Sequence, residues 1–382
     1  MAWGFAMKKT NVIVLKAVPE SILTSYEELL KLGDYKQVFS KSSEVILKLN
    51  LSWSLFFPSC SSPPWQVEGV VRVLLRDGFK IFPVENQTVV THPWKGAYLN
   101  KWLGVLEKYG LDFIPLPNVE WIKYEPKCEL RALNNLFGDE ILIPKMFIGR
   151  NVMHLATLKT HGHTIITGAI KNAFGGLIPK YRHHAHKCIH EVLVDLLKIQ
   201  LEIHTGIFAV IDGTVAGDGA GPRTMTPKEC DLIIGGADQV AVDAVCAKIM
   251  GFDPMNIDFL RMAHEEGLGC ADLDAIDIVG DVDVKKLNYK FKTRRSPVVF
   301  FDQLLRKRLA KYLPFVEKLV FHTPLFKLAI LGSAVYHDYI WYPLIGRRRV
   351  KKFLKTKWGK LWLNYPYGKY PENAYLREWD PY

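Results

Sequence analysis

The sequence is poor in cysteine, and its cysteines are scattered. It has six in 382 residues, and no two of them form a Cys-x-x-Cys pair. This excludes the usual motifs of iron–sulfur clusters, zinc ribbons and small disulfide-stapled domains. We therefore predict reduced thiols, a cytoplasmic chain and no iron–sulfur cluster.

Long apolar runs are also missing. No stretch reaches eighteen uncharged apolar residues, and the nearest, residues 325–345, is interrupted by Lys327 and Asp338. Residues 1–9 lack the apolar core of a secretory signal. A membrane-spanning helix is not expected, whereas a helix lying on a membrane surface stays open.

Charge is distributed unevenly along the chain. Residues 286–382 hold 21 Lys and Arg against 6 Asp and Glu, whereas the preceding residues hold 29 against 33. We therefore predict a body at residues 8–283, as one unit or as two lobes at 8–145 and 146–283. A basic, aromatic-rich, helical C-terminal extension at 284–382 follows it.

Strand-like and helix-like patterns alternate through the body. Short apolar runs at residues 11–15, 45–49, 80–84, 152–158 and 206–211 predict buried strands, and residues 65–76, 98–109, 186–202 and 238–250 have helical spacing. Such alternation is typical of an α/β fold with a mostly parallel sheet and helices on both faces.

Chemistry-bearing residues concentrate in residues 154–190, which contain seven of the twelve histidines. We predict His161, Lys171 and His186 as catalytic residues, because imidazoles suit proton transfer near neutral pH and a buried lysine can anchor a substrate or cofactor. His161 and His186 are also the predicted metal ligands. The alternatives are a loop histidine bonded to backbone and a surface lysine.

Several further polar residues are predicted to bind an anionic substrate. Lys159 and Arg182 would clamp its charge, and the alternative for both is an ordinary ion pair. The other predicted contacts follow apolar strands or adjoin Lys171, and they are Lys48, Asn50, Asn172 and Asp212. For Lys48 and Asn50, closure of a sheet edge is an equal alternative.

An ordered set of motifs resembles the domain-of-unknown-function family 362. It spans roughly residues 8–283 and comprises Lys48-Leu-Asn50, Leu158-Lys-Thr-His161, Lys171-Asn-Ala-Phe-Gly175, Arg182 and His186, Val210-Ile-Asp-Gly213, Gly219-Ala-Gly-Pro222 and Gly236-Ala-Asp-Gln-Val-Ala-Val-Asp243-Ala. Many members of that family carry ferredoxin-type cysteine motifs, which this sequence lacks.

The order of His161, Lys171 and His186 also resembles that of nickel-pincer lactate racemases. This distant resemblance implies racemase-like acid/base chemistry with a divalent metal such as nickel. Lys171, Gly175 and Gly221 would then be the cofactor-binding positions.

The extension interleaves basic and aromatic residues, and it holds 21 of the 46 aromatics. Residues 323–362 would suit an anionic membrane surface or a protein partner. Packing of the aromatics on the body is the other main interpretation. Nucleic acid is the least expected partner, because no recognisable module is present and the body is mildly acidic.

Two classes of function follow from these features. The first is an enzyme of the isomerase or oxidoreductase class that acts on a small carboxylate through the His/Lys cluster. The second is a non-catalytic anion- or metal-binding protein that docks through its basic extension. The density of titratable groups among glycines favours the enzyme.

Overall fold

The computed structural model describes residues 10–88, 90–138, 141–178, 182–309, 312, 314–321, 323 and 325–377. Within them lies a mixed sheet of nine strands in the order β11-β1-β10-β9-β7-β2-β3-β4, with β8 paired to β7. The strands are β1 (Thr10–Lys16), β2 (Glu44–Lys48), β3 (Lys80–Glu85), β4 (Ile114–Pro115), β7 (Asn151–His161), β8 (Ile165–Ile166), β9 (Ile207–Ala220), β10 (Thr224–Gly236) and β11 (Ile276–Gly280). The short strands β5 (Trp121–Lys123) and β6 (Leu142–Pro144) form a separate pair.

The pairing is mostly parallel. Neighbours from β9 through β7, β2 and β3 to β4 run parallel, as do β1 and β11. Only β10 and β8 pair antiparallel to their neighbours in this sheet. The predicted α/β class is confirmed.

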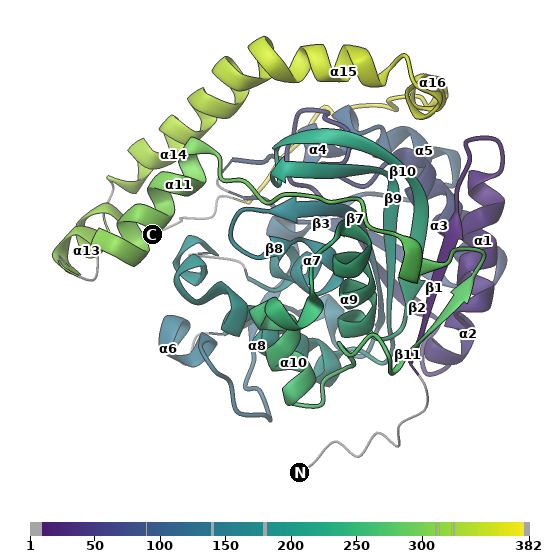
Figure 1. Cartoon of the computed structure of the whole chain (residues 1–382), viewed down its shortest axis with the longest axis horizontal. Helices are drawn as coiled ribbons and strands as arrows, with labels where there is room; N and C mark the ends of the chain where they lie inside the picture. Colours follow the sequence, from purple (N-terminus) through teal and green to yellow (C-terminus); the bar gives the residue numbers. More distant parts are fainter. Residues whose placement is uncertain are drawn as a thin grey trace.

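Helices cover both faces of the sheet (Figure 1). One apolar core joins it to α1 (Ile22–Leu32), α2 (Tyr35–Val38), α3 (Pro64–Arg76), α4 (Pro93–Leu99) and α5 (Trp102–Lys108). The other joins it to α6 (Leu133–Phe137), α7 (Gly168–Leu177), α8 (Ile189–Ile203), α9 (Gln239–Met250) and α10 (Asp258–Glu265). Short 3₁₀ turns complete the body at Leu116–Asn118, Lys145–Phe147, η3 (Arg182–Cys188), Pro254–Asn256 and Val284–Lys286.

Two predicted boundaries are wrong for identifiable reasons. The helix expected at 98–109 is divided into α4 and α5, because Lys101 adopts a left-handed conformation between them. The strand expected to end at Ile211 continues as β9 to Ala220, because it forms a long hairpin with β10.

The extension forms a helical arm outside the body (Figure 1). Its helices are α11 (Pro297–Gln303), the π-helical η6 (Leu304–Leu309), α13 (Pro314–Phe321), α14 (Phe326–Ala334), the π-helical η7 (Val335–Gly346), α15 (Arg347–Phe353) and α16 (Lys357–Asn364). Trp341, Trp358 and Trp362 are buried against the body, so some of its aromatics pack as one interpretation predicted. Among the described residues, no helix is both long and apolar enough to cross a membrane.

Candidate functional site

The candidate site lies where the order in which successive strands are added to the parallel sheet reverses. From β2 the chain places β3 and β4 on one side and β7 and β9 on the other. Helices α3 and α5 cover one face, whereas α7 and α8 cover the opposite face. In open α/β sheets ligands bind at the carboxyl ends of the two central strands of such an arrangement, here β2 and β7. The buried polar cluster at these two strand ends is called the crevice below.

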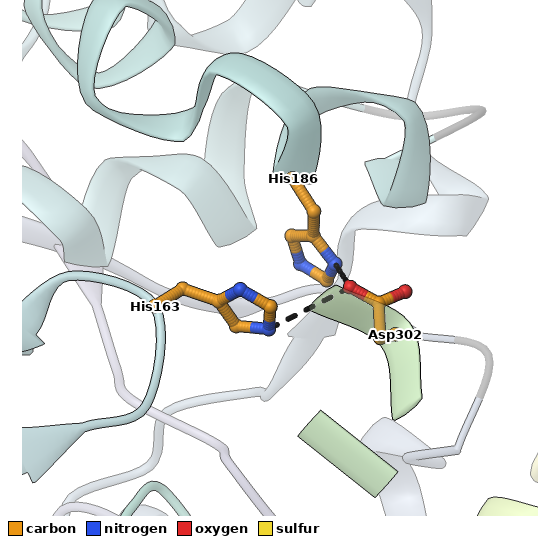
Figure 2. Close-up of side chains that lie close together, drawn as sticks. All are labelled: His163, His186 and Asp302. Atoms are coloured by element: carbon orange, nitrogen blue, oxygen red, sulfur yellow. Dashed lines mark ion pairs between the residues drawn. The ribbon is translucent and has the colours of Figure 1, made fainter. Parts of the chain in front are cut away.

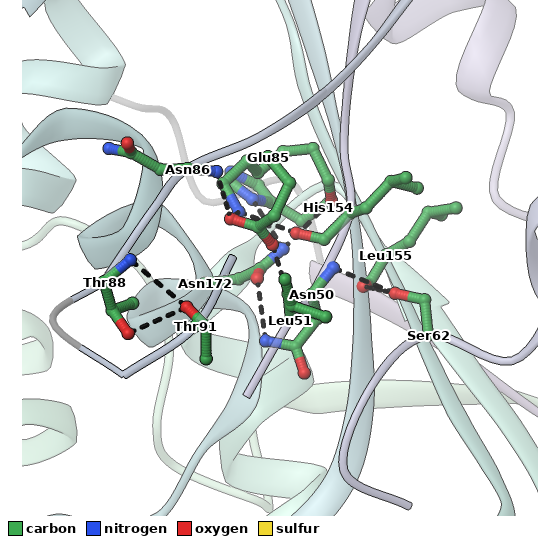
Figure 3. Close-up of polar contacts among 12 residues, drawn as sticks. Asn50, Leu51, Ser62, Glu85, Asn86, Thr88, Thr91, His154, Leu155 and Asn172 are labelled. Carbon is green, nitrogen blue, oxygen red and sulfur yellow. Dashed lines mark hydrogen bonds and ion pairs between the residues drawn. The ribbon is translucent and has the colours of Figure 1, made fainter. Parts of the chain in front are cut away.

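Four of the predicted contact residues meet in this crevice. The Asn50 side chain accepts a hydrogen bond from Lys159 Nζ at 2.5 Å and donates to Asn172 Oδ1 at 3.1 Å. Asn172 Nδ2 in turn donates to the backbone oxygen of Lys48 at 3.1 Å. Figure 3 shows Asn172 reaching from α7 toward Asn50 and the end of β2.

The positive charge of Lys48 is balanced by a buried ion pair with Glu85. Its Nζ lies 2.8 Å from Glu85 Oε1, and both side chains are buried. Glu85 also accepts hydrogen bonds from the backbone amides of Leu51 and Asn86. Lys48 therefore fixes the ends of β2 and β3 together. Sequence reasoning missed Glu85, although its place at the end of the strand next to β2 was a usable signal.

Lys159 is the uncompensated charge of the crevice. Its side chain is 0% exposed, and besides Asn50 it donates to Cys60 O at 2.9 Å and to Thr157 Oγ1 at 2.6 Å. Among the described residues, no carboxylate forms an ion pair with it. Burial, which is the largest influence, and the nearby Lys171 lower the pKa of Lys159 to about 7, although Cys60 and Glu85 act in the opposite direction.

His161 connects the crevice to a cavity. It is the last residue of β7, and as an alternate strand residue it lies on the same side as Lys159. Burial, followed by the charge of Lys171, holds the pKa of His161 well below its usual range, so the imidazole is neutral at pH 7. Its Nδ1 accepts a hydrogen bond from the His163 amide at 3.2 Å.

The cavity has a volume of about 540 Å³, and residues of the extension line one side of it. Its lining residues are His161, Gly162, His163, Ile165, Thr293, Arg294, Arg295, Phe300, Gln303 and Leu304. The two arginines make its mouth positive, and sequence reasoning missed them because the extension was expected to be a separate unit.

Helix α7, which carries Lys171 and Asn172, is held at its first turn by Asp243. The Asp243 carboxylate accepts hydrogen bonds from the amides of Ala169 at 2.6 Å and Ile170 at 3.0 Å. A Cβ at Gly168 would lie 2.3 Å from the same carboxylate, and Gly168 has a φ of +75°. The sequence therefore needs glycine at the start of α7 and an acid at residue 243.

His186 lies next to His163. The two rings stack with centroids 4.7 Å apart, and Asp302 of α11 faces both (Figure 2). Asp302 had no signal in the sequence.

The remaining predicted residues lie elsewhere or serve packing. Asp212 is not at a strand end, and its carboxylate accepts hydrogen bonds from Tyr26 and Trp65 on the side of α1 and α3. The side chain of Arg182 lies outside the described residues.

The two glycines predicted to hold a cofactor are not among the residues that line the cavity. A Cβ at Gly175 would lie 3.3 Å from Lys48 Nζ, and one at Gly221 would lie 1.7 Å from Thr160 O. Both glycines therefore allow close packing.

Comparisons with known proteins agree on the family. Residues 45–248 match the family described as a domain of unknown function (DUF362). The chain is similar to a thylakoid-associated protein of Synechocystis sp. (strain ATCC 27184 / PCC 6803 / Kazusa), with 27% identity over 263 residues, which are 65% of this chain and 75% of that protein. No solved structure matches the chain significantly. The resemblance to lactate racemases is not shown by these comparisons.

Proposed function

The chain belongs to the domain-of-unknown-function family 362, and we propose that it is an enzyme that moves a proton on a small carboxylate substrate. The reaction would take place where the crevice between β2 and β7 meets the cavity beside the arm.

One observation carries this proposal. Lys159 is fully buried two residues before His161, which lines the cavity, and its hydrogen-bond partners are all neutral. Burying an amine without a nearby acid is costly, and strongly perturbed titratable groups gather at functional sites. A substrate carboxylate would supply the missing negative charge.

Each group then has a role that follows from its position. Arg294 and Arg295 attract the anion to the mouth of the cavity, and Lys171 holds the carboxylate. Neutral His161 has its lone pair on Nδ1, and at this atom it accepts a proton from the carbon next to the carboxylate, in place of the hydrogen bond from the His163 amide. Lys171 stabilises the negative charge that develops on the carboxylate. Lys159 then returns a proton, because its pKa of about 7 suits both protonation states at neutral pH.

A binding experiment tests the first half of this proposal. Thermal unfolding is measured with lactate, malate, oxalate or inorganic phosphate at millimolar concentration. We expect at least one carboxylate to raise the Tm of the wild type by several degrees. The Lys171→Met variant should lose this shift, whereas Lys187→Met, which changes an exposed lysine on η3, should keep it.

Two results would contradict the binding step. One is a wild type that no carboxylate stabilises, and the other is an equal shift in Lys171→Met. A shift from phosphate alone would replace the carboxylate by a phosphate-bearing ligand at the same lysines.

A second proposal concerns the arm, which we infer docks on an anionic membrane surface. Its exposed apolar side chains include Leu328, Leu331, Val335 and Tyr339, which are 65%, 59%, 40% and 75% exposed. The first three share one face of α14 and its continuation, by their spacing of three and four residues.

The opposite side of the arm is fastened to the body. Trp53 Nε1 donates to Asp338 Oδ1 at 2.7 Å, and Trp341 packs on Trp53 and Phe57. The apolar face is therefore held outward.

Basic residues follow directly after this apolar face. The exposed ones on α15 and the turn after it are Arg347, Arg348, Lys351, Lys352 and Lys355. Each basic residue near an anionic surface adds about 1 kcal/mol to binding. The name of the thylakoid-associated relative supports the same proposal.

Co-sedimentation with liposomes tests the docking. We expect the protein to sediment with phosphatidylglycerol liposomes and much less with phosphatidylcholine ones. Exchanging Leu328, Leu331 and Val335 for serine should abolish sedimentation. The matched control exchanges three exposed apolar residues of the body, Val18, Leu32 and Ile148, and should leave it unchanged. Equal losses in both triple variants would rule out docking through the arm.

A further inference from the structure

Three potential ligands converge at the junction of body and arm. His163 comes from the turn between β7 and β8, His186 from η3, and Asp302 from α11. One ligand atom of each lies within 4.8 Å of the others (Figure 2). Each of the three residues therefore comes from a different part of the fold.

The spacing of these atoms suits an ion between them better than direct contact. His163 Nε2 and His186 Nδ1 each lie 3.9 Å from the same carboxylate oxygen, Asp302 Oδ2, which is longer than a hydrogen bond. A metal about 2.0–2.2 Å from each ligand would bring such pairs to roughly 3.4 Å. Small side-chain movements would therefore close the site.

Neighbouring residues orient the carboxylate. Arg306 Nε donates to the other oxygen, Asp302 Oδ1, at 2.9 Å, and the guanidinium is itself buried over the ring of Phe321 at 3.5 Å. This leaves Oδ2 directed at the two imidazoles. In protein metal sites, the ligands are typically oriented by hydrogen bonds from neighbouring residues.

We propose that His163, His186 and Asp302 bind a divalent transition-metal ion, such as zinc or nickel. Two imidazoles and one carboxylate suit these ions, and three protein ligands leave further coordination positions open. Because His163 also lines the cavity, an open position would lie at its wall, within reach of an oxygen of a bound anion. The ion would also fasten α11 to the body.

The proposal differs from the sequence-based prediction in its ligands. His161 was expected to bind the metal with His186, but its Nδ1 accepts the His163 amide and its ring lies beside the crevice. His163 and Asp302 take its place. A metal-free cluster in which the two histidines and Asp302 share a proton would use the same contacts, so the experiment must separate the two.

The metal content of the full chain distinguishes a metal site from a metal-free cluster. The purified protein is stripped with a chelator, dialysed against Zn²⁺ or Ni²⁺, and examined by elemental analysis and native mass spectrometry. We expect one ion per chain in the wild type. The His163→Ala, His186→Ala and Asp302→Asn variants should bind at least tenfold more weakly, and the ion should raise the Tm of the wild type more than that of these three variants.

His184→Ala and His161→Ala are the controls, and both should retain the ion. Asp302→Asn alone decides the question if a histidine variant fails to fold, because it preserves the size of the side chain. A wild type that takes up neither ion, or variants that all retain it, would overturn the proposal. The measurement needs no substrate, so its outcome is independent of carboxylate binding.

Discussion

Lys159 is the residue on which the account of the site depends. Its pKa is lowered to about 7 in the folded protein, chiefly by burial, whereas an unfolded lysine titrates near 10.4. Between these values the unfolded chain binds more protons than the folded one, so stability rises with pH. Below about pH 7 both states are protonated and the cost of burying the charge is fully present.

This difference between the folded and unfolded pKa of Lys159 predicts a contribution to stability that depends on pH and is lost when Lys159 is replaced. The free energy of unfolding of the wild type relative to Lys159→Met should rise by roughly 1 kcal/mol per pH unit between about pH 7.5 and 9. Urea unfolding at several pH values measures it. Lys31→Met, at an exposed position of α1, is the control and should show no such trend. A parallel pH profile for the wild type and Lys159→Met would mean that Lys159 is not buried as a charge.

Residue types in the sequence indicated the crevice but not all of its partners. Asn50 was predictable from its place after a buried strand, because such residues meet at one edge of a parallel sheet. Lys159 and Asn172 were predicted because they lie in the histidine-rich residues 154–190. Asp212 was misplaced, since the hairpin with β10 extends β9 beyond it. Asp302 and Arg294 were out of reach, because tertiary packing of the arm brings them to the site.

At the scale of single elements, α7 decides whether the lysine and the asparagine reach the crevice. Asp243 from α9 accepts hydrogen bonds from two amides of its first turn. Thr167, the residue before α7, forms no side-chain cap hydrogen bond. An acid of a neighbouring helix therefore caps α7.

Removing this contact should weaken the fold as well as the site. We expect Asp243→Ala to lower the free energy of unfolding by about 2–4 kcal/mol, because it leaves two buried amides without an acceptor. Asp274→Ala, at an exposed position before β11, should cost less than about 0.5 kcal/mol. Chemical denaturation of both variants provides the comparison. Equal stabilities would show that α7 does not depend on Asp243.

At the scale of the whole molecule, the arm contributes both to the cavity of the candidate site and to the proposed docking surface. Residues within 293–304 line the cavity, whereas residues 325–345 present an outward apolar face and 347–355 a basic one. The sequence predicted the arm's charge and aromatics, but it could not predict that one end of the arm would complete the candidate site. A protein docked through this arm would hold its cavity close to the membrane surface.

The central claim, that this site moves a proton on a small carboxylate, is tested most directly by hydrogen exchange. The protein is incubated in D₂O with lactate, malate or alanine, and proton NMR follows loss of the signal from the carbon next to the carboxylate. We expect exchange of at least one compound by the wild type. His161→Gln should lower the rate at least a hundredfold while keeping the carboxylate-induced rise in Tm, and His264→Gln should match the wild type. Carboxylate binding without any exchange would contradict the enzyme and leave a non-catalytic anion-binding protein.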